Sequence, residues 1–483
     1  MTITPPADLL ARLEGAAVVR GDGVEVVDER RFREELLDDL VFDAVFAADA
    51  ELRDAARWVI WSASQALGCG SASTHELYVA RGRGDIDPTR FTVPAINVRA
   101  ATYLTARQAF AAALERDAGT VIFEIAKSEM AYTDQRPDEY TAVILAAAMR
   151  EGWRTPVFLQ GDHFQFNATK WSADADGELQ GLRDLTREAV EAGFLNIDID
   201  SSTLVDLSQP TVAEQQRVNA ANTAELTRLI RALQPSGVTV SVGGEIGEVG
   251  KSNSTEEELR AYLDGYRRLL GEGIDGISKV SVQTGTSHGG VPMPDGSVAE
   301  VKIDFETLQR LSTVAREEYG LAGCVQHGAS TLPEEAFHHF PVHGTAEIHL
   351  ATGFQNILFD TGGLPGDLRE EMMEWCRVNA ADERTAGETE EQFLYRTRKK
   401  AIGPFKRRLW TLPADASAQI AANLRAKFGL LFDELGIAGT RALVERHVPV
   451  VAVPRPLPPS LGGDARRTIT AGASVFEDDG SGE

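Results

Sequence analysis

The sequence predicts a (β/α)8 barrel with helical extensions at both ends. Three observations support this fold class. The 483 residues are enough for one large barrel with extensions. Short apolar runs alternate with amphipathic stretches over roughly 260 residues, and there are eight such runs. An open doubly wound sheet is the alternative, but no G-x-G-x-x-G follows the first run, so its dinucleotide-binding version has no support.

The eight expected strands are short, rich in β-formers and separated by helical segments. They lie at residues 93–99, 119–126, 155–163, 194–202, 238–247, 276–285, 322–329 and 344–352. Residues 99–116, 211–233 and 254–273 carry apolar side chains at helical spacing. Strict alternation of strand and helix favours parallel pairing through helical crossovers, which is the architecture of the barrel.

The segments outside the alternating region differ from it in composition and in the spacing of their apolar residues. Residues 1–88 predict a mostly helical N-terminal extension without a catalytic motif, before a barrel over 89–360. Residues 361–448 predict a helical region that packs on the barrel or on a neighbouring subunit. Residues 449–483 are rich in proline and then small and acidic, which predicts a disordered tail.

Charge and composition exclude several classes of protein. The 48 basic and 73 acidic residues give a formal charge of −25, which disfavours nucleic-acid binding. No run approaches the roughly 18 apolar residues that cross a bilayer, so we expect no membrane span. The first residues lack a basic segment followed by an apolar one, and the three cysteines are far apart. Together these features predict a cytoplasmic protein.

Titratable residues follow several of the expected strands. In a (β/α)8 barrel the carboxyl ends of the strands carry the catalytic groups. The candidates there are Asp162 and His163 after the third strand, Glu245 and Glu248 after the fifth, His288 after the sixth and His327 after the seventh. One such histidine is ordinarily a satisfied polar residue. Three of them predict a catalytic zinc site with an open position, provided that the barrel brings them together.

Glycine-rich turns follow two of these histidines. The segments HGG at 288–290, HGAS at 327–330 and HLATG at 349–353 leave backbone N–H groups uncovered where late barrel strands often hold phosphate. An anion bound beside the metal is therefore expected.

Eight motifs in order resemble one family. They are PAINV (94–98), GDH (161–163), FLNIDIDSS (194–202), GGEIGEVG (243–250), GTSHGG (285–290), VKIDFETL (301–308), HGAS (327–330) and GTAEIHLAT (344–352). From about 93 to 437 the chain resembles the class II, metal-dependent fructose-bisphosphate aldolases and their ketose- and tagatose-bisphosphate relatives.

The resemblance implies roles for the candidate residues. His163, His288 and His327 would hold Zn2+ or another divalent cation, with Glu245 as an alternate ligand or a neighbour of the ligands. A monovalent cation is compatible with the same resemblance. Asp162 would move the proton on the C4 oxygen of a phosphorylated ketose.

The resemblance also implies a substrate-binding set. Its members are Asn97, Gly289, Gly328, Ser330, His349, Thr352 and Arg408. Gly289, Gly328, Ser330 and Thr352 would face the phosphate of dihydroxyacetone phosphate. Arg408 would reach the second phosphate from a neighbouring subunit, which implies a homodimer or a higher homo-oligomer.

The chain departs from the family pattern at several positions. His349 stands where the family commonly has asparagine, and EIAKSEM (124–130) replaces a serine or threonine near the end of the second strand. The loop carboxylate that removes a proton from dihydroxyacetone phosphate is open between Glu248 and Glu256, and counting places Asn253 at its position.

These features predict reversible, zinc-dependent cleavage of fructose 1,6-bisphosphate to dihydroxyacetone phosphate and glyceraldehyde 3-phosphate. Tagatose- or another ketose-bisphosphate cleavage is the alternative within the family. FEIAKSEMAYTDQ and DSSTLVDLSQPTVAEQQ resemble the supporting subunit of tagatose-bisphosphate aldolase, so a non-catalytic supporting subunit stays open. A Schiff-base mechanism would need Lys279 on the sixth strand, which we interpret instead as a salt-bridged barrel residue.

Overall fold

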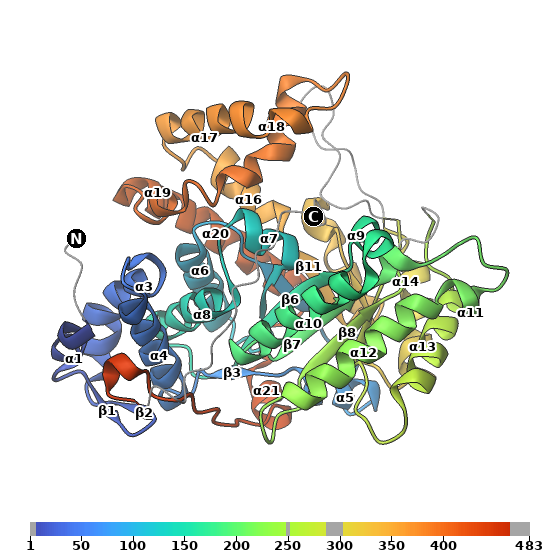
Figure 1. The fold of residues 1–483 in the computed structure, drawn as a ribbon, viewed down its shortest axis with the longest axis horizontal. Coiled ribbons are helices and arrows are strands. Elements are labelled where there is room, and N and C mark those ends of the chain that lie inside the picture. Colours follow the sequence, from blue (N-terminus) through green and yellow to red (C-terminus); the bar gives the residue numbers. More distant parts are fainter. Residues whose placement is uncertain (1–5, 248–251, 286–302, 464–483) are drawn as a thin grey trace.

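The chain folds into a closed barrel of eight parallel strands, as the sequence predicts (Figure 1). A computed structural model describes residues 6–247, 252–285 and 303–463. The barrel strands are β4 (Val93–Asn97), β5 (Ile122–Ala126), β6 (Val157–Gln165), β7 (Asn196–Asp200), β8 (Ser241–Glu245), β9 (Lys279–Val282), β10 (Cys324–Gln326) and β11 (Glu347–Leu350). Consecutive strands pair in parallel, and the pairing of β11 with β4 closes the ring.

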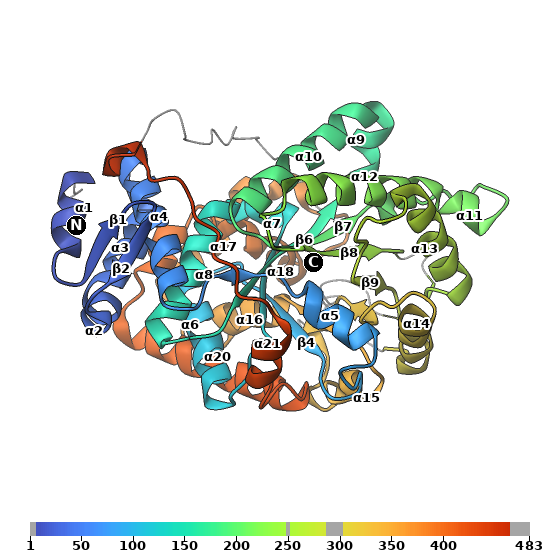
Figure 2. The ribbon, with the colours of Figure 1, turned by 90° about the horizontal axis from the view of Figure 1, so that it is seen from below.

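Helices surround the barrel and connect its strands (Figure 2). They are α6 (Thr102–Glu115), α7 (Lys127–Tyr132), α8 (Pro137–Glu151), α9 (Ala168–Ala173), α10 (Ala175–Glu191), α11 (Val212–Gln215), α12 (Arg217–Leu233), α13 (Glu256–Leu270), α14 (Phe305–Glu317), α15 (His339–Val342) and α16 (Thr352–Asp360). In α13 the Thr255 and Glu258 side chains form a capping box that starts the helix. Its buried face repeats at helical spacing through Leu259, Tyr262 and Tyr266.

The N-terminal extension is largely helical and also contains a hairpin. Its elements are α1 (Pro6–Leu13), β1 (Ala17–Arg20), β2 (Gly23–Val26), α2 (Glu29–Arg31), the π-helix η1 (Phe32–Leu36), α3 (Leu37–Phe46), α4 (Ala50–Ala66), β3 (Ser71–Ala72) and α5 (His75–Gly82). The sequence prediction of helices omits the hairpin, whose strands are only four residues long. Gly21, with φ of +58°, begins the two-residue turn between them.

Two parts of the extension join the barrel directly. The short strand β3 pairs in parallel with the first residues of β6. Helix α4 packs against α8 and α3. The extension is therefore part of one continuous hydrophobic core with the barrel.

The C-terminal region is helical, as predicted. It contains α17 (Gly366–Asn379), α18 (Glu390–Thr397), α19 (Lys406–Trp410), α20 (Ala414–Glu434) and α21 (Arg441–His447). Helix α20 packs on α6 of the barrel, whereas α17 and α18 project from it in Figure 1. Within the described ranges, no helix combines the length and the apolar character that a membrane crossing requires.

The first part of the tail lies on the N-terminal extension. The indole N–H groups of Trp58 and Trp61 donate to the carbonyl oxygens of Arg455 and Val453, at 3.1 and 2.8 Å. The Arg455 guanidinium stacks on the Trp61 ring and pairs with Asp138 at 3.0 Å. The sequence predicts disorder for the whole tail, but the described tail residues have fixed partners on α4 and α8. Residues 464–483 lie outside the described part.

Candidate metal centre and active site

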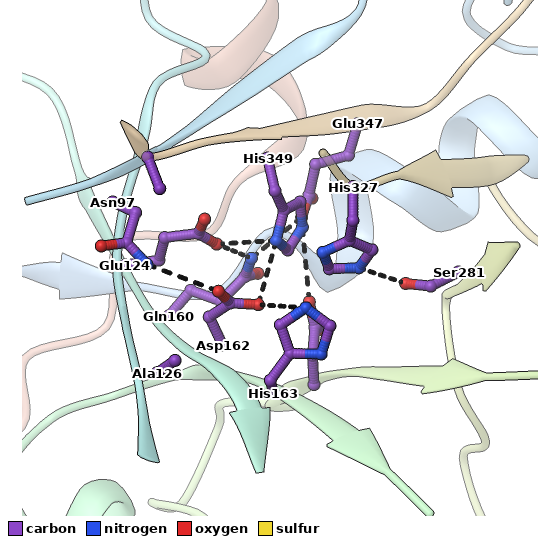
Figure 3. Close-up of polar contacts among 12 residues, drawn as sticks. Asn97, Glu124, Ala126, Gln160, Asp162, His163, Ser281, His327, Glu347 and His349 are labelled. Carbon is purple, nitrogen blue, oxygen red and sulfur yellow. Dashed lines mark hydrogen bonds and ion pairs between the residues drawn. The ribbon is translucent and has the colours of Figure 1, made fainter. Parts of the chain in front are cut away.

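Buried polar side chains line the barrel interior, from Lys279 and Glu347 at the start of β9 and β11 to residues near the carboxyl ends of other strands (Figure 3). Alternate residues of a strand face the same side, so one barrel strand contributes two or more of them. They are Glu124 of β5, Gln160, Asp162 and His163 of β6, Asp198 and Asp200 of β7, Lys279 and Ser281 of β9, His327 after β10, and Glu347 and His349 of β11. Such a density of buried charge requires close pairing of opposite charges or a bound cation.

A bulge in β6 sets the direction of His163. The pairing register between β6 and β7 shifts between Gly161 and Phe164. His163 adopts a φ of +40°, which is uncommon for a residue with a side chain. Bulges of this kind re-aim side chains next to functional sites. Here the ring of His163 lies beside that of His327, with 4.1 Å between the ring centroids.

His163, His327 and Asp162 form a group that can hold a metal ion. One ligand atom from each of these buried residues lies within 4.8 Å of the other two. On its other side, Nδ1 of His163 is 3.1 Å from Oδ2 of Asp200 and 3.3 Å from Oε2 of Glu245. The strands therefore bring together four of the expected centre residues, Asp162, His163, His327 and Glu245. Imidazole and carboxylate are the usual ligands of catalytic zinc.

Two neighbours hold the carboxylate of Asp162. Nδ1 of His349 is 3.0 Å from Oδ1 of Asp162, and the Asn97 amide donates to Oδ2 at 3.5 Å. The Asn97 amide also donates to Glu129 at 2.6 Å, and Glu129 accepts from Arg99 Nε at 2.6 Å. These bonds restrict Asp162 to one orientation at the barrel mouth.

Lys279 lies deeper in the barrel and is fully paired. Its ammonium group donates to Gln160 at 2.7 Å and to Asp198 at 2.9 Å, and it forms a further ion pair with Glu347. Burial lowers the pKa of Lys279, but the carboxylates of Asp198 and Glu347 outweigh it and raise the pKa. The two ion pairs agree with the interpretation of Lys279 as a salt-bridged barrel residue, because a Schiff-base lysine would need a lowered pKa.

The pKa shifts describe how the side chains of the cluster balance one another's charge. Burial alone would lower the pKa values of His163 and His349, but surrounding carboxylates raise both well above the usual range. Burial works against ionisation of Asp162 as well, yet the neighbouring His163 and His349 lower the pKa of Asp162. Burial, reinforced by Asp162, raises the pKa of Glu124. The cluster is thus built to surround positive charge, which a divalent cation would supply in place of the proton on His163.

The expected phosphate-facing residues lie on adjacent loops. Gly328 adopts a φ of +69° after β10. The hydroxyl of Ser330 accepts from the backbone N–H of Ala351 at 2.6 Å, which joins the ends of β10 and β11. Thr352 begins α16 directly afterwards. Gly328, Ser330 and Thr352 therefore lie around a helix N-terminus, a common place for anions.

Other predicted site residues lie elsewhere or outside the described part. Glu248, His288 and Gly289 fall in the undescribed segments 248–251 and 286–302. Glu256 pairs with Arg260 at 3.1 Å in the first turn of α13. Arg408 pairs with Glu371 on the surface. Among described residues, no contact joins either Glu256 or Arg408 to the buried cluster, so their roles stay predictions.

The sequence analysis did not single out four of the interior carboxylates. They are Glu124, Asp198, Asp200 and Glu347. A signal for them exists in the strand sequences, because NIDID and EIHL place polar residues at alternate positions. These positions share the inward face with known candidates, as Glu347 does with His349.

Comparisons with known proteins are consistent with this architecture. Residues 85–406 match the family described as fructose-bisphosphate aldolase class-II. No curated protein sequence matches the chain. Similar solved structures include a probable tagatose 6 phosphate kinase from Sinorhizobium meliloti 1021, with 19% identity, a TM-score of 0.50, and coverage of 77% of this chain and 96% of that one.

Two further structures are aldolases. The YdjI aldolase from Escherichia coli K12 has 13% identity and a TM-score of 0.47, over 76% of this chain and 99% of that one. The fructose-bisphosphate aldolase from Campylobacter jejuni has 17% identity and a TM-score of 0.45, over 77% and 97%. The family match, by contrast, covers well over half of the chain. The chain therefore belongs to the class-II fructose-bisphosphate aldolase family.

Proposed function

We propose that the chain catalyses the metal-dependent, reversible aldol cleavage of fructose 1,6-bisphosphate to dihydroxyacetone phosphate and glyceraldehyde 3-phosphate. Tagatose bisphosphate or another ketose bisphosphate is the alternative substrate. The observation that supports this proposal is the buried group of Asp162, His163 and His327, whose ligand atoms lie within 4.8 Å of one another. The group occupies the mouth of a barrel that belongs to the class-II fructose-bisphosphate aldolase family.

The proposed metal is Zn2+ or another divalent cation. His163 and His327 would hold it, with His288 as the third ligand by its motif and Glu245 beside them. When bound, such an ion polarises the ketose carbonyl and stabilises the negative charge that develops as the C3–C4 bond breaks. The carboxylates around His163, which raise its pKa, support this assignment because they favour positive charge at this position.

Asp162 is the proposed group that moves the proton. Its lowered pKa keeps it as a carboxylate at neutral pH. In the cleavage direction it would accept the proton of the C4 hydroxyl, and in condensation it would return that proton. The hydrogen bonds from His349 and Asn97 hold the carboxylate in place for this transfer.

The substrate phosphate would lie against the loops after β10 and β11. Gly328, Ser330 and Thr352 would face it, together with the backbone N–H groups that begin α16. Glu248 and Glu256 are the two candidates for the base that removes a proton from dihydroxyacetone phosphate. Arg408 would act on the second phosphate from a neighbouring copy, in a homodimer or larger assembly.

The experiment that tests the proposal is a cleavage assay of the purified full chain. Formation of dihydroxyacetone phosphate is measured with fructose and tagatose bisphosphates, with a chelator, and after return of zinc, cobalt or manganese. We expect cleavage that the chelator abolishes and one of these metals restores. His163→Ala should lose bound metal and activity, whereas His447→Ala, at the end of α21, should keep both. Failure of the metal-supplied chain to cleave any ketose bisphosphate would favour the supporting-subunit alternative.

A further inference from the structure

Helix α5 of the N-terminal extension closes the end of the barrel opposite the active site. The Arg81 guanidinium donates at 2.8 Å to the carbonyl oxygens of Phe91 and Thr345, just before β4 and β11 begin. The backbone N–H and hydroxyl of Thr74 donate to Asn196, the first residue of β7, at 2.8 and 3.0 Å. Figure 2 shows α5 near β4 and β9.

The contact between α5 and the barrel is close. A Cβ atom added to Gly82 would lie 2.1 Å from the carbonyl oxygen of Gly320, which precedes β10. Only glycine allows the helix to approach so closely. The helix is therefore held firmly enough to present a side chain to the barrel interior in one position.

That side chain is Tyr78. It is 1% exposed, and its hydroxyl donates to Oε2 of Glu347 inside the barrel. Burial, reinforced by Glu347, raises the pKa of Tyr78 well above its usual range, so the hydroxyl stays a donor.

A continuous series of hydrogen bonds leads from Tyr78 to Asp162. Oε1 of Glu347 is 2.7 Å from Nε2 of His349. The other nitrogen of that ring, Nδ1, is 3.0 Å from Oδ1 of Asp162. Tyr78 holds one oxygen of the Glu347 carboxylate, and His349 contacts the other, which also accepts from Gln160 and pairs with Lys279. Tyr78 therefore helps to set the plane of that carboxylate and, through it, the orientation of the imidazole.

We propose that the N-terminal extension supplies a positioning residue to the active site: Tyr78, acting through Glu347 and His349, orients the carboxylate of Asp162. Tyr78 lies outside the residues that match the aldolase family, which begin at 85, so the series joins a segment outside the family match to the family's barrel. The inference rests on the proposed role of Asp162 in proton transfer. It also gives a reason for a histidine at 349, since an asparagine side chain is shorter and could not join Glu347 to Asp162 in the same way.

The variant that tests the proposal is Tyr78→Phe, which removes only the hydroxyl. Loss of an outer partner of this kind reduces activity by about 10- to 100-fold. We expect kcat to fall about tenfold, with KM and metal content within about twofold of the wild type. Tyr266→Phe is the matched control, because Tyr266 is equally buried and donates at 3.2 Å to Thr227 in the outer helices. It should lower stability to a similar degree without changing kcat.

A double variant tests whether the effect passes through His349. In the His349→Asn background the series is already broken, so adding Tyr78→Phe should change kcat by less than about twofold. A full tenfold loss in that background, or equal losses in Tyr78→Phe and Tyr266→Phe, would overturn the proposal.

Histidine-selective 15N NMR of the metal-loaded chain gives a readout that does not depend on activity. The ring signals of His349 should shift in Tyr78→Phe and stay unchanged in Tyr266→Phe. If the wild type cleaves no ketose bisphosphate but the His349 signals shift, the positioning series stands and the proposed function fails. Unchanged His349 signals in Tyr78→Phe would refute the positioning role.

Discussion

Lys279→Met should destabilise the fold, mainly because it leaves one buried carboxylate without its nearest partner of opposite charge. Lys279 lies inside the barrel and neutralises Asp198 and Glu347. Without it, Glu347 keeps the Tyr78 hydroxyl and keeps Gln160 and His349 at 2.9 and 2.7 Å.

In the same variant, Asp198 would keep fewer and weaker polar contacts than Glu347. Nε2 of His349 lies 3.6 Å from its Oδ2, and its Oδ1 has no hydrogen-bond partner among the described residues. Leaving one member of a buried ion pair uncompensated costs about 3–5 kcal/mol. We therefore expect the free energy of unfolding to fall by about 3–5 kcal/mol. Adding Asp198→Asn should return about 2 kcal/mol, because the uncompensated charge is gone.

The loss should depend on pH with a definite sign. Burial raises the pKa of Asp198 even with Lys279 opposing it, and the variant removes that opposition. A carboxyl with a raised folded-state pKa contributes stability at low pH and loses it as the pH rises through that pKa. The penalty of Lys279→Met should therefore be smaller at about pH 5 than at about pH 8.

Guanidinium unfolding, followed by the fluorescence of the six tryptophans, measures both the free energy of unfolding and its dependence on pH. Lys427→Met is the control, because Lys427 pairs at the surface with the exposed Glu334 and should cost less than about 1 kcal/mol. A penalty for Lys279→Met below about 1 kcal/mol at about pH 8, or one that grows at about pH 5, would refute this reasoning. Borohydride reduction in the presence of dihydroxyacetone phosphate should leave Lys279 unmodified, and an adduct there would contradict the metal-dependent mechanism.

Three further predictions concern the site and the barrel floor. Asp162→Asn should lower kcat by about 10²- to 10⁴-fold with metal content retained, as kinetics with metal analysis would show, whereas equal loss of both would assign Asp162 to metal binding. Because the pKa of His163 is raised, protons compete with the metal for this imidazole. Calorimetry should therefore show a metal affinity that falls about tenfold for each unit by which the pH decreases. A metal affinity that does not change with pH would exclude His163 as a ligand. Gly82→Ala should lower the free energy of unfolding, because the added methyl group would clash with Gly320. Gly181→Ala, in open space on α10, should raise the free energy of unfolding by about 0.5–1 kcal/mol. Equal effects of the two variants in denaturant titrations would contradict the close packing of α5.

The elements of the barrel could be predicted from local sequence. Helices and strands differ in the spacing of their apolar residues, and that spacing is visible without any partner. The rule that parallel barrel strands end at one mouth then placed Asp162, His163, Glu245 and His327 together, which the structure confirms for these residues.

The interior network could not be predicted in the same way. Whether Glu124 or Asp198 faces the inside depends on how each strand is rotated and staggered in the closed barrel. A single-residue shift would turn those carboxylates outward. The bulge at His163 is a local deviation of this kind, and the sequence GDHF contains no pattern that predicts it.

By itself, the sequence determined the strand and helix order, the barrel and the residue types gathered at its mouth, because these follow from short-range periodicity and from chain direction. Only the tertiary structure decided which charges meet inside. Tyr78 and Glu347 are 269 positions apart, and their contact exists because α5 closes the barrel floor while β11 completes the wall. Contacts of this range depend on the packing of the whole molecule, and no local pattern records them.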